Sequence, residues 1–119
     1  MGLIVESTIF PLRVSLRDKD SWELVIDITN AEEKATRVQV EIDLPKQVTF
    51  TRAGYSTRYE NKLDNLKPGD SISLKIPIFV SRHGVVGDYG GIIKITEHYS
   101  EYGYVTNTYN KEVLLRIVP

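Results

Sequence analysis

The sequence contains no cysteine and almost no net charge, and each absence removes a class of function. Without cysteine there is no disulfide framework, no thiolate nucleophile and no zinc ribbon. The 15 lysines and arginines nearly balance the 16 aspartates and glutamates, for a formal net charge of -1. A chain so close to neutrality lacks the long-range field that gathers DNA or RNA, so we expect no nucleic-acid partner.

Long apolar runs are missing as well. Nothing approaches the roughly 18 consecutive apolar residues that a membrane span requires. Residues 1–9 include Glu6 and lack both the basic start and the apolar run of a signal peptide. We therefore expect no membrane insertion and a chain that is soluble as given, while its compartment stays unassigned.

What is present is an ordinary globular composition. The chain has 119 residues, of which 41% are hydrophobic and 26% charged, so disorder is not expected. This length is close to the commonest domain size and is enough to bury a core without staples. We predict one domain over residues 1–119.

The dominant pattern is alternation of apolar and polar residues, which is typical of strands with one buried face. Its clearest runs end at turn residues and include Trp22, which falls in register with the buried set and is predicted to lie in the core. The apolar members of these runs are Leu12, Val14 and Leu16; Trp22, Leu24, Ile26 and Ile28; Val38, Val40, Ile42 and Leu44; Ile72, Leu74, Ile76, Ile78 and Val80. Two further strands are expected at 92–99 and 104–118, joined by a tight connection.

This pattern predicts an all-β protein, an immunoglobulin-like antiparallel β-sandwich of about seven strands. Residues 52–66 are the weakest stretch and read as a short strand or a crossing loop. Pro77 interrupts a convincing strand, and because proline has no N–H to donate, that strand is expected at a sheet edge or at a bulge. Pro68 and Gly69 fit a type II turn, and Asn30 is suited to bond the backbone two residues on.

Three segments resemble the CARDB-like family of immunoglobulin-fold modules, which occur in bacterial and archaeal surface or multidomain proteins. They are residues 24–30, 35–45 and 66–74, with the sequences LVIDITN, ATRVQVEIDLP and LKPGDSISL. The resemblance implies a sandwich fold, an accessory role in adhesion, spacing or assembly, and a cell-surface or secreted setting. It implies no catalytic residues.

Catalytic and metal-binding patterns are sparse. The two histidines, His83 and His98, lie in different elements, and both are expected at the surface without a catalytic partner. Asp18 and Asp20 could offer oxygens to calcium, with Asp88 as a further ligand, but a β-turn explains Asp18 and Asp20 adequately. We expect no enzyme activity, no cofactor and no metal.

Two surface features could bind a partner. The glycine-rich stretch 84–91 is expected to be a loop that presents Val85, Val86 and Tyr89, although a plain connection explains it equally well. The second feature is a crowd of tyrosines at the predicted hairpin end. They are Tyr99, Tyr102 and Tyr104.

Tyrosine offers a large contact area with a polar tip and is enriched at interfaces, but cross-strand pairing within a sheet also accounts for such a cluster. We therefore expect a non-catalytic protein-interaction, assembly or adhesion-type module that binds a protein partner or itself. The alternative is a carbohydrate-binding module that uses the tyrosines as a stacking surface.

Overall fold

The computed structural model describes residues 2–17, 21–51, 56–98 and 105–119, and all of its regular elements are strands. The alternating runs at 22–28, 38–44 and 72–80 become long strands because alternate side chains enter a common core. The strands are β1 (Leu3–Phe10), β2 (Arg13–Ser15), β3 (Ser21–Asn30), β4 (Thr36–Asp43), β5 (Val48–Thr49), β6 (Arg58–Leu66), β7 (Ser71–Val80), β8 (Gly87–His98) and β9 (Val105–Val118).

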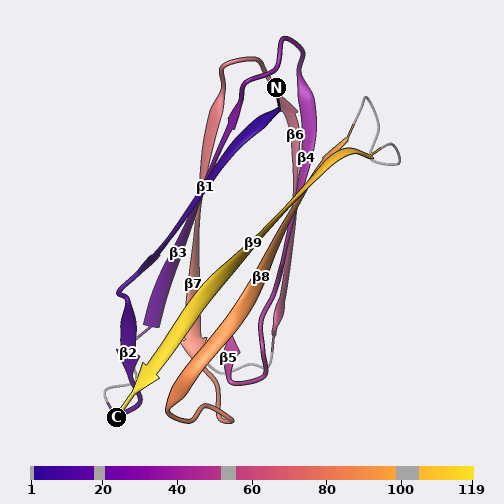
Figure 1. Ribbon diagram of the computed structural model, residues 1–119. Coiled ribbons are helices and arrows are strands. Elements are labelled where there is room, and N and C mark those ends of the chain that lie inside the picture. Colours follow the sequence, from indigo (N-terminus) through magenta and orange to yellow (C-terminus); the bar gives the residue numbers. More distant parts are fainter. Residues whose placement is uncertain (1, 18–20, 52–55, 99–104) are drawn as a thin grey trace.

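The strands form two sheets that pack face to face, as Figure 1 shows. One sheet has the order β1-β3-β7-β5 and the other β2-β9-β8-β4-β6. All pairings are antiparallel except that of β2 with β9. The predicted all-β, immunoglobulin-like sandwich is confirmed, with nine strands in place of about seven.

The core lies between the two sheets and is made by the inward residues of the alternating strands. Its largest fully buried members include Trp22, Leu24, Ile26, Ile28, Ile42, Ile78, Ile93, Ile95, Leu115 and Ile117. The prediction that Trp22 is a core residue is therefore confirmed. Apolar side chains of this kind stabilise the fold by removing their surface from water, at about 25 cal/mol per Å².

The first seventeen residues differ from the sequence-based expectation. The alternation at 12–16 predicted a strand with Leu12 buried, but β2 covers only Arg13–Ser15 and Leu12 is 78% exposed. β1 was not predicted at all. The chain leaves the first sheet after Phe10, passes through the cis bond to Pro11, and joins the second sheet at β2. Leu12 lies in this crossing between layers, which takes it out of the core.

Two local predictions, those for Gly69 and Asn30, are confirmed. Gly69 has a φ of 81°, and the carbonyl of Lys67 accepts the Asp70 N–H, as a tight turn requires. The Asn30 side-chain oxygen accepts the Glu32 N–H at 2.8 Å. The stretch 52–66 was left open between a short strand and a crossing loop; β6 occupies Arg58–Leu66, and residues 52–55 lie outside the described part of the chain.

The sandwich is elongated, with extents of 48 × 23 × 19 Å. The start of β1 and the end of β9 lie at opposite ends of the long axis (Figure 1). β8 and β9 run along most of that axis, so the β7–β8 loop lies at one end, and the end of β8 and the start of β9 lie at the other.

Candidate functional site

The β7–β8 loop, residues 81–86, is the first candidate surface, and its backbone is tied down at several points. The Ser81 N–H donates to the Gln47 carbonyl at 2.9 Å, and the Ser81 hydroxyl donates to the Lys46 carbonyl at 2.6 Å. The Gly84 N–H then returns to the Ser81 carbonyl at 2.9 Å. These bonds anchor the loop to the segment that precedes β5.

Val85 and Val86 lie at the exposed part of this loop, with 58% and 49% of their surface accessible. The Tyr89 hydroxyl donates to the Val85 carbonyl at 2.8 Å. Two adjacent apolar side chains are thus held outward on a loop that is bonded on both sides. A loop ordered in advance loses less conformational entropy on binding than a free one does.

Tyr89 itself is not displayed at the loop tip. The glycine-rich stretch was expected to be loop from 84 to 91, but β8 begins at Gly87, so Tyr89 is a strand residue. Its ring is half-buried and packs against the core cluster. In the structure the Tyr89 hydroxyl is bonded to the loop, and the exposed apolar surface of the loop is made by the two valines.

The tyrosine cluster falls outside the described residues, because Tyr99, Tyr102 and Tyr104 all lie in the stretch 99–104. The strands on either side do pair antiparallel, up to His98 opposite Val105, so the predicted pairing of the last two strands is confirmed, while the tight connection itself lies outside the described residues. The end of β8 and the start of β9 lie at the opposite end of the sandwich from the β7–β8 loop (Figure 1).

The hairpin end contains a run of buried polar residues that the sequence did not signal. Thr96, Glu97 and His98 are all buried, and Asn107 donates its side-chain N–H to the Glu97 carboxylate at 3.1 Å. The expectation of surface histidines is confirmed for His83, which is exposed, and is wrong for His98, which is 4% exposed. His98 pairs with Arg37 on β4 and Val105 on β9, so it lies inside the five-stranded sheet between two neighbouring strands.

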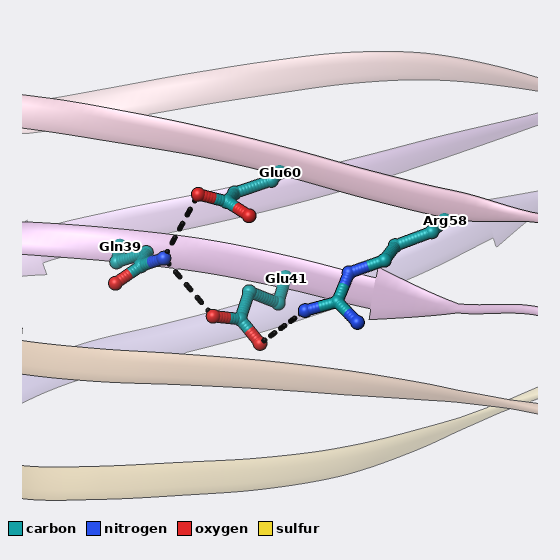
Figure 2. Close-up of polar contacts among 4 residues, drawn as sticks. All are labelled: Gln39, Glu41, Arg58 and Glu60. Carbon is teal, nitrogen blue, oxygen red and sulfur yellow. Dashed lines mark hydrogen bonds and ion pairs between the residues drawn. The ribbon is translucent and has the colours of Figure 1, made fainter.

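The outer face of the five-stranded sheet is polar over β4 and β6. Figure 2 shows that the Gln39 amide donates to the carboxylates of Glu41 and Glu60, at 3.0 and 3.1 Å. Arg58 approaches the other oxygen of Glu41 at 3.5 Å. Glu41 and Glu60 are cross-strand neighbours, so the shared amide and the arginine offset their repulsion. This half of the face is well suited to contact with water.

The other half of that face, over β8 and β9, is more apolar. Ile92 and Leu114 are diagonal neighbours there, and both are about half exposed. Asp88 and Arg116 form a cross-strand ion pair beside them, with 2.9 Å between Nε and Oδ1. An exposed pair of this kind contributes about 0–1 kcal/mol, so it shapes the surface more than it stabilises the fold.

Two further findings concern chemistry and membranes. Among the described residues, no group of three or more histidine, aspartate and glutamate side chains is arranged to hold a metal ion. Asp18 and Asp20 lie outside that set. The described part of the chain also has no helix that is long and apolar enough to cross a membrane.

Comparison with known proteins places the fold. No family model matches the chain, and no curated protein matches its sequence. Solved structures do match. Native α-2-macroglobulin from Escherichia coli, in the fragment from domain MG7 to the C-terminus, superposes with a TM-score of 0.66 at 22% identity, over 98% of this chain and 16% of that one.

A second structure of the Escherichia coli protein, its native conformation seen by cryo-EM, gives a TM-score of 0.69 at 20% identity, over 99% of this chain and 7% of that one. The FixG-related protein from Vibrio parahaemolyticus gives 0.57 at 9% identity, and there 98% of this chain covers 97% of the other. The chain thus spans only a small part of the macroglobulin chains. The neighbours are immunoglobulin-like β-sandwich domains, and at these identities the likeness concerns the fold.

Proposed function

We propose that this chain is a non-catalytic protein-interaction or assembly module that contacts its partner through the β7–β8 loop. The observation that supports it most directly is the pair Val85 and Val86, exposed on a loop that is hydrogen-bonded to Gln47, Lys46 and Tyr89. Exposed apolar side chains on a pre-ordered loop are favourable contact residues, because burying them on binding costs little ordering.

The fold supports the same class of function. Immunoglobulin-like sandwiches hold their loops on a rigid frame, and binding residues lie disproportionately on such loops. The CARDB-like resemblance adds adhesion, spacing or assembly as the setting, with a cell-surface or secreted location. The carbohydrate alternative finds no support in Tyr89, because its half-buried ring and bonded hydroxyl leave no flat platform there.

A site-specific photo-crosslinker tests the loop. The reactive residue replaces Val86 in one version of the chain and Lys75, an exposed residue on the outer face of the other sheet, in a matched version. Both are incubated with lysate of the source cells. We expect a discrete protein adduct at position 86 that is lost when Val85→Ser is added.

The position-75 version gives the background. Equal adducts at both positions, or none at position 86, would overturn the proposal. Thermal unfolding of each version shows that the fold is retained, since both sites are exposed and substitutions there are expected to change stability by about 0.5 kcal/mol or less.

A further inference from the structure

β1 is an edge strand with backbone groups that no strand uses. It pairs with β3 on one side, and among the described residues no strand pairs with its other side. The Ala31 N–H bonds the Gly2 carbonyl, and antiparallel ladders alternate, so Leu3, Val5, Ser7 and Ile9 direct their N–H and C=O groups away from β3. The Leu3 N–H bears this out, because it donates to the Tyr109 hydroxyl at 3.1 Å.

The open edge of β1 lacks the residues that usually discourage strand addition. Lysine, proline at the edge and inward-pointing charges are the common protections. β7 and β9 are also partly open, because the short strands β5 and β2 cover only their ends. Both have such protections: β7 has Lys75 and Pro77, and β9 has the half-buried Lys111, which faces inward. β1 reads LIVESTIF, with Glu6 as its one charge and β-branched or aromatic residues at most other positions. Segments of this composition pair readily with other strands.

The outer face of β1 is apolar at both ends and polar in the middle. Ile4 and Phe10 are 53% and 74% exposed, and Glu6 and Thr8 lie between them. This order is nearly the same when it is read backwards. A strand whose pattern is self-complementary in the antiparallel sense fits a copy of itself.

We propose that a second copy of this chain pairs with β1 across a twofold axis at Ser7, and so joins the two four-stranded sheets into one. Val5 then lies opposite Ile9 of the second copy on the inner face. On the outer face Ile4 meets Phe10, and Glu6 meets Thr8. The open groups of Val5, Ser7 and Ile9 all find backbone partners.

Neighbouring registers are worse. An axis at Glu6 sets two carboxylates opposite each other, and an axis at Thr8 sets Glu6 against Phe10; both arrangements are unfavourable across a strand pair. The backbone hydrogen bonds between the two copies also end at defined residues on either side of the axis. The Leu3 N–H is already bonded to Tyr109, and Pro11 has no N–H to donate. The interface is short, so the dimer forms in a concentration-dependent manner.

Cysteine cross-linking reads the register directly, because the chain has no cysteine of its own. Glu6→Cys and Thr8→Cys are both exposed positions on the outer face. In the proposed dimer residue 6 lies opposite residue 8 in a non-hydrogen-bonded pair, where Cα atoms are about 4.5 Å apart and a disulfide fits. Identical residues are diagonal, at roughly 7–8 Å, which is too far.

Oxidising a mixture of the two variants is expected to give a disulfide-linked heterodimer, while each variant alone stays mostly monomeric. Equal cross-linking in all three samples, or none in any of them, would overturn the register and with it the proposal. A peptide strand from another protein as the true occupant would also appear as no cross-linking in the purified chain.

Sedimentation supplies an independent measurement. Phe10→Ser removes two of the apolar cross-strand contacts in the dimer and is expected to raise its dissociation constant about tenfold. Leu12→Ser is the matched control, because Leu12 is equally exposed but lies outside the paired strand. An equal effect of both substitutions would count against the β1 interface. Replacing Val85 and Val86 by serine leaves this dimer intact, so the dimer and the loop contact fail separately.

Discussion

β1 and β7 belong to the same sheet, and each has a side with unpaired backbone groups. The two strands differ in whether residues that discourage strand addition lie along that side. The short β5 pairs only with Phe79 and Val80, so most of β7 has no further neighbour among the described residues. Lys75 and Pro77 lie along this open stretch, whereas β1 has neither residue type between Leu3 and Phe10. One sheet thus has a protected edge and an unprotected one, which indicates that only one edge is kept from pairing.

The protection of β7 follows from its backbone register. The Asn30 N–H bonds the Asp70 carbonyl, and the Ser81 N–H bonds the Gln47 carbonyl, so the odd-numbered residues of β7 direct their backbone groups away from β3. Pro77 is one of them, and at that position it removes an outward donor without breaking the ladder to β3. The prediction from sequence that Pro77 marks an edge is confirmed.

The largest expected effect is a loss of stability from a substitution in β3, the strand that holds both β1 and β7. Ile26 lies on β3, between β1 and β7, and has no exposed surface. Ile26→Ala leaves a cavity and is expected to lower the free energy of unfolding by about 2–5 kcal/mol. Ile4→Ala, the same substitution at an exposed position of β1, is expected to cost about 0.5 kcal/mol or less in the monomer.

Urea unfolding at low protein concentration measures both values, since dilution removes any contribution from association. Similar losses for the two variants would mean that β1 is part of the core rather than an edge. Unfolding of the Ile26→Ala variant in two steps would show that the two edges do not depend on the same core.

The alternating strands could be predicted because burial of one face leaves a direct record in the sequence. The runs at 22–28 and 38–44 became β3 and β4, and Asn30 and Gly69 took the predicted turn roles. β1 left no such record. Its outward residues include Ile4 and Phe10, so apolar residues occupy both faces and the period-two signal disappears.

The candidate sites could be predicted only as residue types. Exposure of Val85 and Val86 was expected from the glycines around them, but the bond from the Tyr89 hydroxyl to the Val85 carbonyl depends on where β8 begins. The open groups of β1 were not accessible either, because they follow from pairing with β3, about twenty residues away in the chain. Spacing within a sequence does not record which side of a strand is left unpaired.

The second-largest effect is expected on the dissociation constant of the proposed dimer, with the fold of the monomer unchanged. Ser7→Pro gives β1 the kind of residue that protects β7, and its lost N–H points away from β3. Two central hydrogen bonds disappear from the proposed dimer, worth about 2 kcal/mol together, which corresponds to roughly a thirtyfold higher dissociation constant. Sedimentation equilibrium measures the constant, and circular dichroism verifies that the fold is kept. An unchanged constant would show that the β1 edge is not the interface.

The smallest effect runs in the opposite direction. A triple variant combines Lys75→Val and Pro77→Val, which remove the two protecting residues from β7, with Ser7→Pro, which blocks pairing at β1. Any self-association of this variant then takes place through β7. We expect weak self-association, well below that of the unmodified chain, because the outer residues Ser71 and Ser73 offer no apolar cross-strand contacts and β5 occupies one end of the strand. Sedimentation velocity at rising concentration measures it, with the Ser7→Pro chain as the reference. If the triple variant stays as monomeric as that reference, Lys75 and Pro77 are not what separates the two edges, and the exposed Ile4 and Phe10 of β1 account for the difference.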